Sequence, residues 1–577
     1  MAFVLTLMRV LPQKPPAFLY HPDERGLICM NRRRAMLFGL DGATWRILDP
    51  MIRRGHLPHL AAMREAGAHG VLSSTVPPVT PAAWTTFQTG LLPANHGLFD
   101  FSGRNEGSYH THVVSSREIV APTLWELASQ AGKRAVAVNV PLTYPPEAVN
   151  GAVVSGMLTP GVKGNLTYPA ALKDQLLAAV PDYRVLVPQT EFNVRGWEPF
   201  VEASEGTVRA RAKAFRFLLE QVVPDWDVAM LHFQETDTLQ HAGYPWLDPS
   251  HPGFCEERYR QGLAVYRAID EEIGAMVTRL ADEDTLVLAL SDHGHQAVSK
   301  MVNVNIALAR AGLLQEADVG GVGILGSAAR AVVTALLRLD RWNLNKRLLP
   351  RAQRRRLVER VTDAIGIDWE ATQAYMIHGW VYAYVNVNLR GREAKGIVDP
   401  ANYLSVRQCA ADALLGMRDP ETGEPIVEKV FTREEAFDGV RVDQAPDLVA
   451  VPHPGYEFSS SILQSGRGLV RPNLIRRDHS GTHSMDGILL AHGRDVALGE
   501  IDEANLVDVF PTVLAWLGIP VPAYAEGNVL QALFRQPLQV SVDGDATLDA
   551  ITSPGDRGFT QEDERVVEER LRSLGYM

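Results

Sequence analysis

Cysteine is scarce in this chain of 577 residues, where Cys29, Cys255 and Cys409 are the three present and lie far apart. Their spacing gives no sign of a disulfide framework or of a thiolate metal site. Because disulfides persist mainly in oxidising compartments, we expect the protein to work in a reducing one, the cytoplasm. The sequon Asn165-Leu166-Thr167 is then incidental.

Long apolar runs are also lacking, since none reaches the roughly 18 residues of a spanning helix. A signal peptide is not evident, because the apolar stretch from Ala2 to Met8 is short and follows no basic segment. We therefore expect no integral membrane segment, and we expect residues 1–34 to form a disordered leader. Residues 1–29 could instead lie upstream of the true start at Met30.

An excess of positive charge is missing too, because the formal net charge is -12. This argues against nucleic-acid binding and against overall attraction to anionic membranes. The segment 330–360 is the exception, with ten Lys and Arg residues against Asp340 and Glu359. We favour a solvated helical insertion there, since long Arg stems often cover an apolar face. Peripheral contact with a membrane surface is the alternative.

What the sequence does contain is a set of apolar runs that end in metal-ligand residue types. The run Thr285 to Leu290 leads into Ser291-Asp292-His293-Gly294-His295 and is typical of a buried parallel strand. Open α/β sheets place their chemistry at the carboxyl ends of such strands. Adjacent Asp and His side chains there can bind one cation, although Asp at a strand end often only fixes a turn.

Three other segments place similar residues beside predicted strands. The strand Ala35 to Leu40 delivers Asp41, for which an N-cap role is the alternative to metal binding. After the strand Asp227 to Phe233 come Asp237 and His241, four residues apart and on one face if that segment is helical. A glycine-rich loop before the strand Ile488 to His492 carries His483.

Further candidates concern the substrate. Thr80 precedes Pro81, a favoured first helical residue, so its hydroxyl would lie at a helix N-terminus that stabilises an alkoxide. A simple N-cap is the alternative role. Asn139 and Tyr144 follow the strand Ala135 to Val140 and either face a substrate or fix a turn beside prolines.

In order and local context these residues resemble the alkaline phosphatase superfamily, most closely its type I phosphodiesterase and nucleotide pyrophosphatase branch. The resemblance covers most of residues 35–310 and 440–530. It implies an α/β fold, an alkaline-phosphatase-like three-layer α/β/α sandwich with an inserted cap region. We expect a leader (1–34), a catalytic core in two parts (35–310 and 441–535), an inserted cap (311–440) and a C-terminal tail with a helix (536–577).

The resemblance also implies two divalent cations, Zn²⁺ by preference because three histidines take part, with Mn²⁺ as the alternative. One cation would be held by Asp41, Thr80, Asp292 and His293, and the other by Asp237, His241 and His483. His295 is expected to lie outside both sets of ligands. Two such ions bring a charge of +4, and the carboxylates of Asp41, Asp237 and Asp292 bring -3. The remaining positive charge would attract an anionic phosphoryl group.

The implied activity is metal-dependent hydrolysis of a small-molecule phosphoester, most closely a phosphodiester, with Thr80 as nucleophile and Asn139 and Tyr144 near the substrate. A phosphomonoesterase, a phosphonate hydrolase and a phosphotransferase to an alcohol or lipid head group are the alternatives, and a non-catalytic binding protein is a further one. One departure stands out: where this branch usually has an asparagine that contacts the phosphoryl oxygens, the chain reads Leu98-Phe99-Asp100-Phe101.

Overall fold

The computed structural model describes residues 32–105, 107–187, 189–317, 366–460, 468–473, 479–548 and 558–574. The chain divides into two compact units. The first contains the described residues up to Leu98, Val114–Gln296 and those from His483 to the end of α18, and the second contains Phe99–Val113 and Ala297–Thr482. Most of the expected leader and the whole basic segment 330–360 lie outside the described residues.

The first unit is built on one central mixed sheet with strand order β19-β2-β18-β9-β1-β8-β5-β6-β7, with β20 paired to β2. In that order the strands span Gly499–Glu500, Ala68–Ser73, Asp486–His492, Thr285–Leu290, Arg34–Leu40, Val228–Phe233, Ala135–Val138, Gly151–Val154 and Thr167–Tyr168, and β20 spans Ala504–Asn505.

The middle of this sheet is parallel, because β9, β1, β8 and β5 run side by side in the same direction. Their sequences are continuous apolar runs, as strands buried on both faces require. The neighbouring strand β18 is antiparallel to β9, with Leu489 opposite Leu290. The amino end of β18 therefore meets the carboxyl ends of β1, β8 and β9 at one edge.

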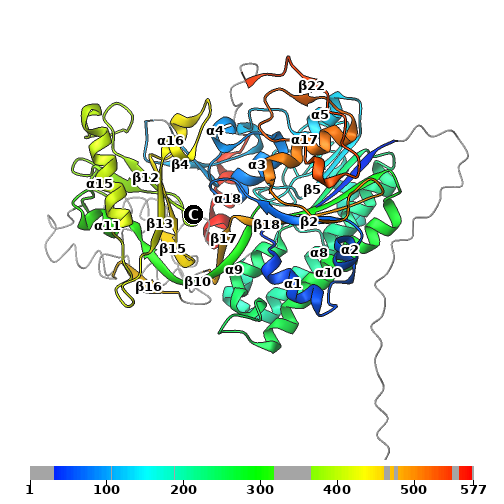
Figure 1. Cartoon of the computed structure of the whole chain (residues 1–577), viewed down its shortest axis with the longest axis horizontal. Coiled ribbons are helices and arrows are strands. Elements are labelled where there is room, and N and C mark those ends of the chain that lie inside the picture. The colour runs from blue at the N-terminus through cyan, green and yellow to red at the C-terminus, as the bar shows by residue number, and fades with distance from the viewer. Residues whose placement is uncertain are drawn as a thin grey trace, which may run out of the picture. The chain divides into compact units, whose positions relative to one another are not determined.

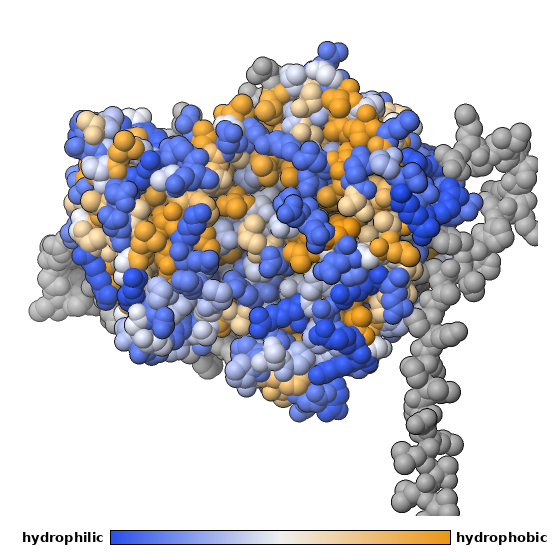
Figure 2. Space-filling view, viewed as in Figure 1, coloured by the Kyte–Doolittle hydropathy of each residue, from blue (hydrophilic) through white to orange (hydrophobic). Residues whose placement is uncertain are grey.

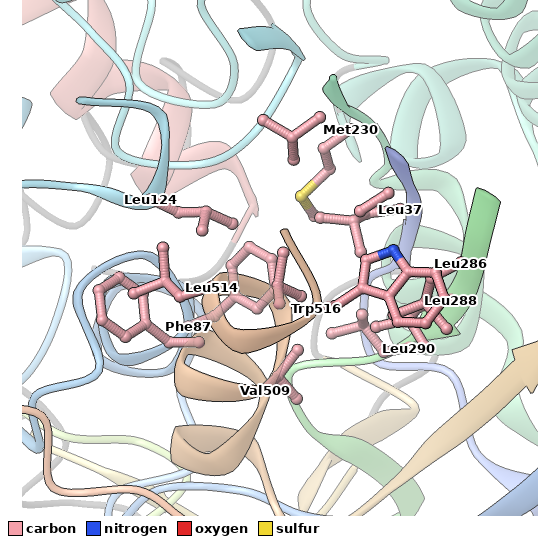
Figure 3. Close-up of a cluster of buried hydrophobic side chains, with 14 of the residues drawn as sticks. Leu37, Phe87, Leu124, Met230, Leu286, Leu288, Leu290, Val509, Leu514 and Trp516 are labelled. Carbon is pink, nitrogen blue, oxygen red and sulfur yellow. The ribbon is translucent and has the colours of Figure 1, made fainter. Parts of the chain in front are cut away.

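Helices cover both faces of the sheet, which gives the predicted three layers (Figure 1). Successive strand residues point to opposite faces. On β1, Leu37 belongs to a buried cluster with α3, α5 and α17, whereas Phe38 packs edge-on against Phe215 of α8, with ring centroids 6.5 Å apart. Figure 3 shows Trp516 of α17 beside Leu37 and Leu286, and Leu514 of the same helix beside Phe87. The α/β/α sandwich is confirmed.

One helical layer consists of α3 (Thr80–Thr89), α5 (Leu124–Gln130) and α17 (Leu506–Leu517). The other consists of α2 (Pro58–Glu65), α8 (Trp197–Phe217), α9 (Glu235–Leu247) and α10 (Glu256–Leu280). The first unit also contains α1 (Trp45–Arg53), α4 (Pro93–His96), α6 (Leu172–Ala179), α7 (Gln189–Arg195), a π-helix (Leu218–Val222), β21 (Val521–Pro522), β22 (Val542–Asp543) and α18 (Gln561–Leu574).

The second unit has its own buried apolar cluster around the antiparallel sheet β11-β12-β14-β13 (Ala374–Met376, Ala383–Val387, Leu448–Pro452 and Val427–Thr432). Helices α11 (Val304–Arg310) and α15 (Tyr403–Leu415) contribute to this cluster. The unit also contains α16 (Arg433–Ala436), the hairpin β3-β4 (Ser102–Arg104 and Thr111–Val113), β15 (Gly455–Ser459) and β16 (Val470–Pro472). Strands β10 (Gly294–Asn303) and β17 (Gly481–Ser484) run across the unit boundaries.

The surface of the described residues is mixed in character. On the face drawn in Figure 2, hydrophilic and hydrophobic residues are interspersed. None of the helices within the described ranges combines the length and the apolar character that crossing a bilayer requires.

Candidate metal centre

Buried acidic and histidine side chains gather where β1, β8 and β9 end and β18 begins. Asp41 follows β1, and Asp292 with His293 follows β9. Asp237 and His241 lie on α9, which opens directly after β8. His483 precedes β18. The parallel and antiparallel pairing described above brings these distant segments to the same sheet edge, and all six side chains are buried.

The first group consists of Asp41, Asp292 and His293, each offering a ligand atom within 4.8 Å of the others. His293 Nε2 lies 3.6 Å from Asp41 Oδ1 and 3.3 Å from Asp292 Oδ2. Thr80 Oγ1 lies 3.5 Å from the same His293 nitrogen. These distances fit the edges of a coordination polyhedron around one small cation.

Asp41 is held in a fixed orientation. Its Oδ2 atom accepts a hydrogen bond from Trp84 Nε1 at 3.0 Å and lies 2.9 Å from His232 Nε2. Its Oδ1 atom is buried and has no hydrogen-bond partner. The same is true of Asp292 Oδ2, while Asp292 Oδ1 accepts from the Gly42 amide at 3.1 Å. Each carboxylate thus has one anchored oxygen and one buried oxygen that faces the group.

The second group consists of Asp237, His241, His295 and His483. Asp237 Oδ1 lies 3.1 Å from His241 Nε2, 3.4 Å from His483 Nε2 and 3.6 Å from His295 Nε2. The Nε2 atoms of His241 and His483 are 3.0 Å apart. One carboxylate oxygen and three imidazole nitrogens therefore converge on one point.

Backbone carbonyls fix the tautomer of three of these histidines. A carbonyl oxygen only accepts hydrogen bonds, so an Nδ1 atom beside it carries the proton and Nε2 keeps its lone pair. Such contacts hold His293 Nδ1 at 3.0 Å from Gly294 O, His295 Nδ1 at 3.1 Å from Gly42 O and His483 Nδ1 at 2.8 Å from Pro78 O. This orientation by outer hydrogen bonds is usual for metal-binding histidine.

The electrostatics of the site call for a cation. Burial and the neighbouring carboxylates raise the pKa of Asp41 well above its usual range, and burial with Asp237 does the same for Asp292. Burial also keeps imidazole neutral: it lowers the pKa of His295 well below its usual range and that of His483 to about 4. Burial would raise the pKa of Asp237 as well, but His241 and the other histidines outweigh it and lower that pKa.

The residues therefore fit divalent cations. Neutral imidazoles and carboxylates with unpartnered buried oxygens are the ligand forms that such ions require. The two groups are neighbours, since the rings of His293 and His483 stack with centroids 3.5 Å apart. The arrangement thus places side by side two buried groups that could each bind a cation.

Thr80 is buried at the start of α3, although not at the expected position. The N-cap residue is Val79, so Thr80 is the first helical residue and Pro81 the second. Helix α3 is buried along its whole length, and Trp84 on its next turn anchors Asp41. The helix thus fixes Thr80 and Asp41 relative to each other.

Asn139 and Tyr144, the two residues expected near the substrate, contact His232 and Phe559 respectively. Asn139 follows β5 with a left-handed backbone (φ 62°), and its Nδ2 atom lies 3.4 Å from His232 Nδ1, so it reaches the first group through His232. Tyr144 is buried and stacks on Phe559 with centroids 5.3 Å apart.

Three residues at the centre were not predicted as part of it. His295 was expected outside both ligand sets, yet it stands in the second group. Trp84 and His232 contact Asp41 Oδ2, and neither was placed in the expected ligand sets. His295 follows His293 by two residues, but it belongs to strand β10 (Gly294–Asn303), whereas His293 lies before that strand.

A comparison with family models agrees with this geometry. The model described as type I phosphodiesterase / nucleotide pyrophosphatase matches residues 35–486. The chain belongs to this family. The type I phosphodiesterases form one family of the alkaline phosphatase superfamily, and the protein is accordingly a phosphoester hydrolase of a metal-dependent family. No curated protein matches the chain.

The residue that departs from the usual pattern of the type I phosphodiesterases lies in the second unit. Asp100 is buried, and its Oδ1 atom accepts a hydrogen bond from the Phe101 amide at 2.7 Å. Burial raises the pKa of this carboxyl group to about 7, against the backbone hydrogen bonds that lower it.

Proposed function

We propose that the protein is a phosphodiesterase that uses Thr80 as its nucleophile and holds two Zn²⁺ ions. Asp41, Asp292, His293 and Thr80 would hold one ion, and Asp237, His241 and His483 would hold the other. The observation that carries this proposal is the placement of the Thr80 hydroxyl 3.5 Å from His293 Nε2, within a group of buried ligands that has a second group beside it.

The side chains of the chain prepare this reaction before substrate arrives. Thr80 lies at the amino end of α3, where the helix dipole favours the alkoxide form of its hydroxyl. Thr80 is buried, and the helix that it opens is buried along its whole length. When bound, two divalent ions would supply positive charge beside the phosphoryl group and would lower the pKa of a coordinated hydroxyl.

The covalent steps balance without a further reactant. Thr80 Oγ loses its proton to solvent and forms a bond to phosphorus, and the phosphorus–oxygen bond to the leaving alcohol breaks. Water then attacks the phosphothreonine ester, which returns Thr80 and releases a phosphomonoester. Zn²⁺ suits the second group because its ligands are mostly imidazole nitrogens, and Mn²⁺ is the alternative.

The deciding experiment compares Thr80→Ala with Thr85→Ala. Thr85 lies on the same buried helix but binds the Pro81 carbonyl oxygen at 2.7 Å, so it is a matched control. We expect Thr80→Ala to lose about 10³-fold or more in kcat on an aryl phosphodiester. Thr80→Ser should keep part of the activity. Unchanged turnover in Thr80→Ala would overturn the mechanism.

The substrate class is tested separately. Rates on aryl phosphodiester, phosphomonoester and phosphonate substrates should rank the diester first. A clear preference for the monoester or the phosphonate would overturn the proposal that the substrate is a phosphodiester, but it would not contradict the proposed metal site. Product analysis with an added alcohol acceptor would reveal transfer to the acceptor instead of to water.

A further inference from the structure

His295 occupies a position that the proposed function does not use. It is the second residue of β10, and its ring is buried, with centroids 4.6 Å from the ring of His241 and 5.1 Å from that of His483. Its Nε2 atom lies 3.6 Å from Asp237 Oδ1 and has no hydrogen-bond partner.

The orientation of this ring is fixed from behind by Gly42. The Gly42 carbonyl oxygen accepts from His295 Nδ1 at 3.1 Å and from Gln240 Nε2 at 2.8 Å. A Cβ atom at Gly42 would lie 2.6 Å from His295 Nδ1, and Gly42 also has a left-handed backbone (φ +62°). Glycine is therefore needed at this position for the ring to approach, and the approach turns the bare Nε2 lone pair into the second group.

A buried histidine usually has hydrogen-bond partners, whereas here an acceptor lone pair points at a carboxylate oxygen that also accepts. Two acceptors face each other favourably only when a cation lies between them. Tetrahedral Zn²⁺ with ligands at about 2.0–2.1 Å places them about 3.4 Å apart. The measured separations from Asp237 Oδ1 to the three histidine nitrogens, 3.1, 3.4 and 3.6 Å, agree with this geometry.

We propose that His295 is a fourth protein ligand in the second group, so that Asp237, His241, His295 and His483 enclose their cation completely. The proposal rests on the metal binding in the proposed function but not on the role of Thr80. Structural zinc sites are closed by four protein ligands, whereas catalytic sites keep an open position. The two ions are then unequal: the second group holds a tight zinc ion, and the first group holds an exchangeable ion whose coordination substrate and water complete.

The test counts metal ions and needs no substrate. The full-length protein is loaded with Zn²⁺ or Co²⁺ and titrated with a coloured chelator. We expect two classes of site, one ion each, that differ in affinity by at least about tenfold, and a tetrahedral Co²⁺ absorption spectrum for the tight class. The variant His295→Asn keeps a donor where Nδ1 donates to Gly42 O but removes Nε2. It should weaken the tight class by about 10–100-fold and change its Co²⁺ spectrum.

Two comparison variants sharpen the result. Asp292→Asn should weaken the exchangeable class and leave the tight class and its spectrum unchanged. His492→Ala removes another buried histidine, at the far end of β18, and should change neither class. The variant His295→Ala, with circular dichroism as a check of folding, guards against an effect of asparagine itself.

The outcomes separate the two proposals. If His295→Asn and His295→Ala both keep the tight class and its spectrum, His295 is not a ligand, even if activity falls. If the unaltered protein binds no metal ion, both proposals fail. If Thr80→Ala stays active while His295→Asn loses the tight ion, only the proposed catalytic mechanism fails.

Discussion

At the scale of single residues, Asp41 shows how the candidate metal centre is organised. One carboxylate oxygen is held by Trp84 and His232, which leaves the other directed into the first group. Neither donor binds a cation itself. The affinity of the first group for its ion therefore depends on side chains that lie behind the ligands.

Replacing Trp84 tests this dependence. The variant Trp84→Phe removes the indole N–H that lies 3.0 Å from Asp41 Oδ2 and keeps an aromatic ring. We expect the affinity of the first group for Zn²⁺ to fall by roughly tenfold, as measured by competition with a chelator. The control is Trp125→Phe, a buried tryptophan whose Nε1 donates to Gln88 Oε1 instead. Equal affinities in the two variants would contradict the role of Trp84.

A second residue-scale prediction concerns pH and Asp100. Burial raises the pKa of its carboxyl group from 3.8 to about 7. The folded state thus binds this proton more tightly than the unfolded state. The contribution of proton binding by Asp100 to the free energy of unfolding is therefore fully present below about pH 4 and is lost as the pH rises through about 7. Asp100→Asn does not titrate, and its side-chain oxygen can still accept from the Phe101 amide.

The variant Asp100→Asn should therefore be more stable than the native protein at pH 8, by roughly 4 kcal/mol at most. The advantage should shrink steadily as the pH falls to 5. Urea unfolding at several pH values measures it, and comparing the two proteins at each pH cancels the contribution of every other group. A difference that does not vary with pH would show that Asp100 titrates normally.

At the scale of elements, a buried ion pair joins the helices that flank the second group. Arg211 of α8 donates from Nη1 to Glu235 Oε2 of α9 at 2.7 Å, and both side chains are buried. Arg211 also donates to the Val185 carbonyl oxygen. Glu235 opens the helix that carries Asp237 and His241, so this pair fixes the start of α9.

Breaking the pair on one side should be costly. The variant Arg211→Met leaves the Glu235 carboxylate buried without its partner, and we expect a loss of about 3–5 kcal/mol in the free energy of unfolding. The double variant Arg211→Met with Glu235→Gln should lose clearly less, because no charge remains unpaired. Denaturant unfolding of the single and double variants measures both values, and equal losses would argue against an electrostatic cause.

Regular periodic segments of the fold are predictable from the sequence. The strand Thr285–Leu290 has the same bounds in the structure as in the sequence analysis, and the expected C-terminal tail contains the helix Gln561–Leu574. Strand β10 was missed because its polar sequence has no clear alternation, and its pairing with β15 and β16 is long-range. The place of His295 depends on that strand, which explains why it was missed with it.

At the scale of the whole molecule, the expected inserted cap and the second compact unit have different bounds. The expected cap spans residues 311–440, whereas the second unit spans Ala297–Thr482 with Phe99–Val113 added. The hairpin β3-β4 in that added segment is bound to the second unit by contacts such as Arg104 Nη2 with Glu393 Oε1 at 2.7 Å. Such pairings between distant segments leave no local signal in the sequence.

Metal removal should destabilise the protein as a whole. Three carboxylates, on Asp41, Asp237 and Asp292, are buried within the two groups, and burial together with neighbouring carboxylates raises the pKa of Asp41 and of Asp292. An ion that binds only the folded state at 100 times its Kd adds about 2.7 kcal/mol. Thermal unfolding with and without chelator should therefore show a Tm several degrees lower without metal, restored by added Zn²⁺. An unchanged Tm would argue against metal binding.

The chain leaves the first unit directly after Gln296 and re-enters it at His483. His295 and His483 therefore stand at the two ends of the segment 297–482, and in the proposed closed site they bind the same ion. That ion would therefore link the two ends of the segment. A pulling force applied to these two ends would have to break metal–ligand bonds before it could separate β18 from β9. The protein with bound metal should therefore resist a higher force than the metal-free protein.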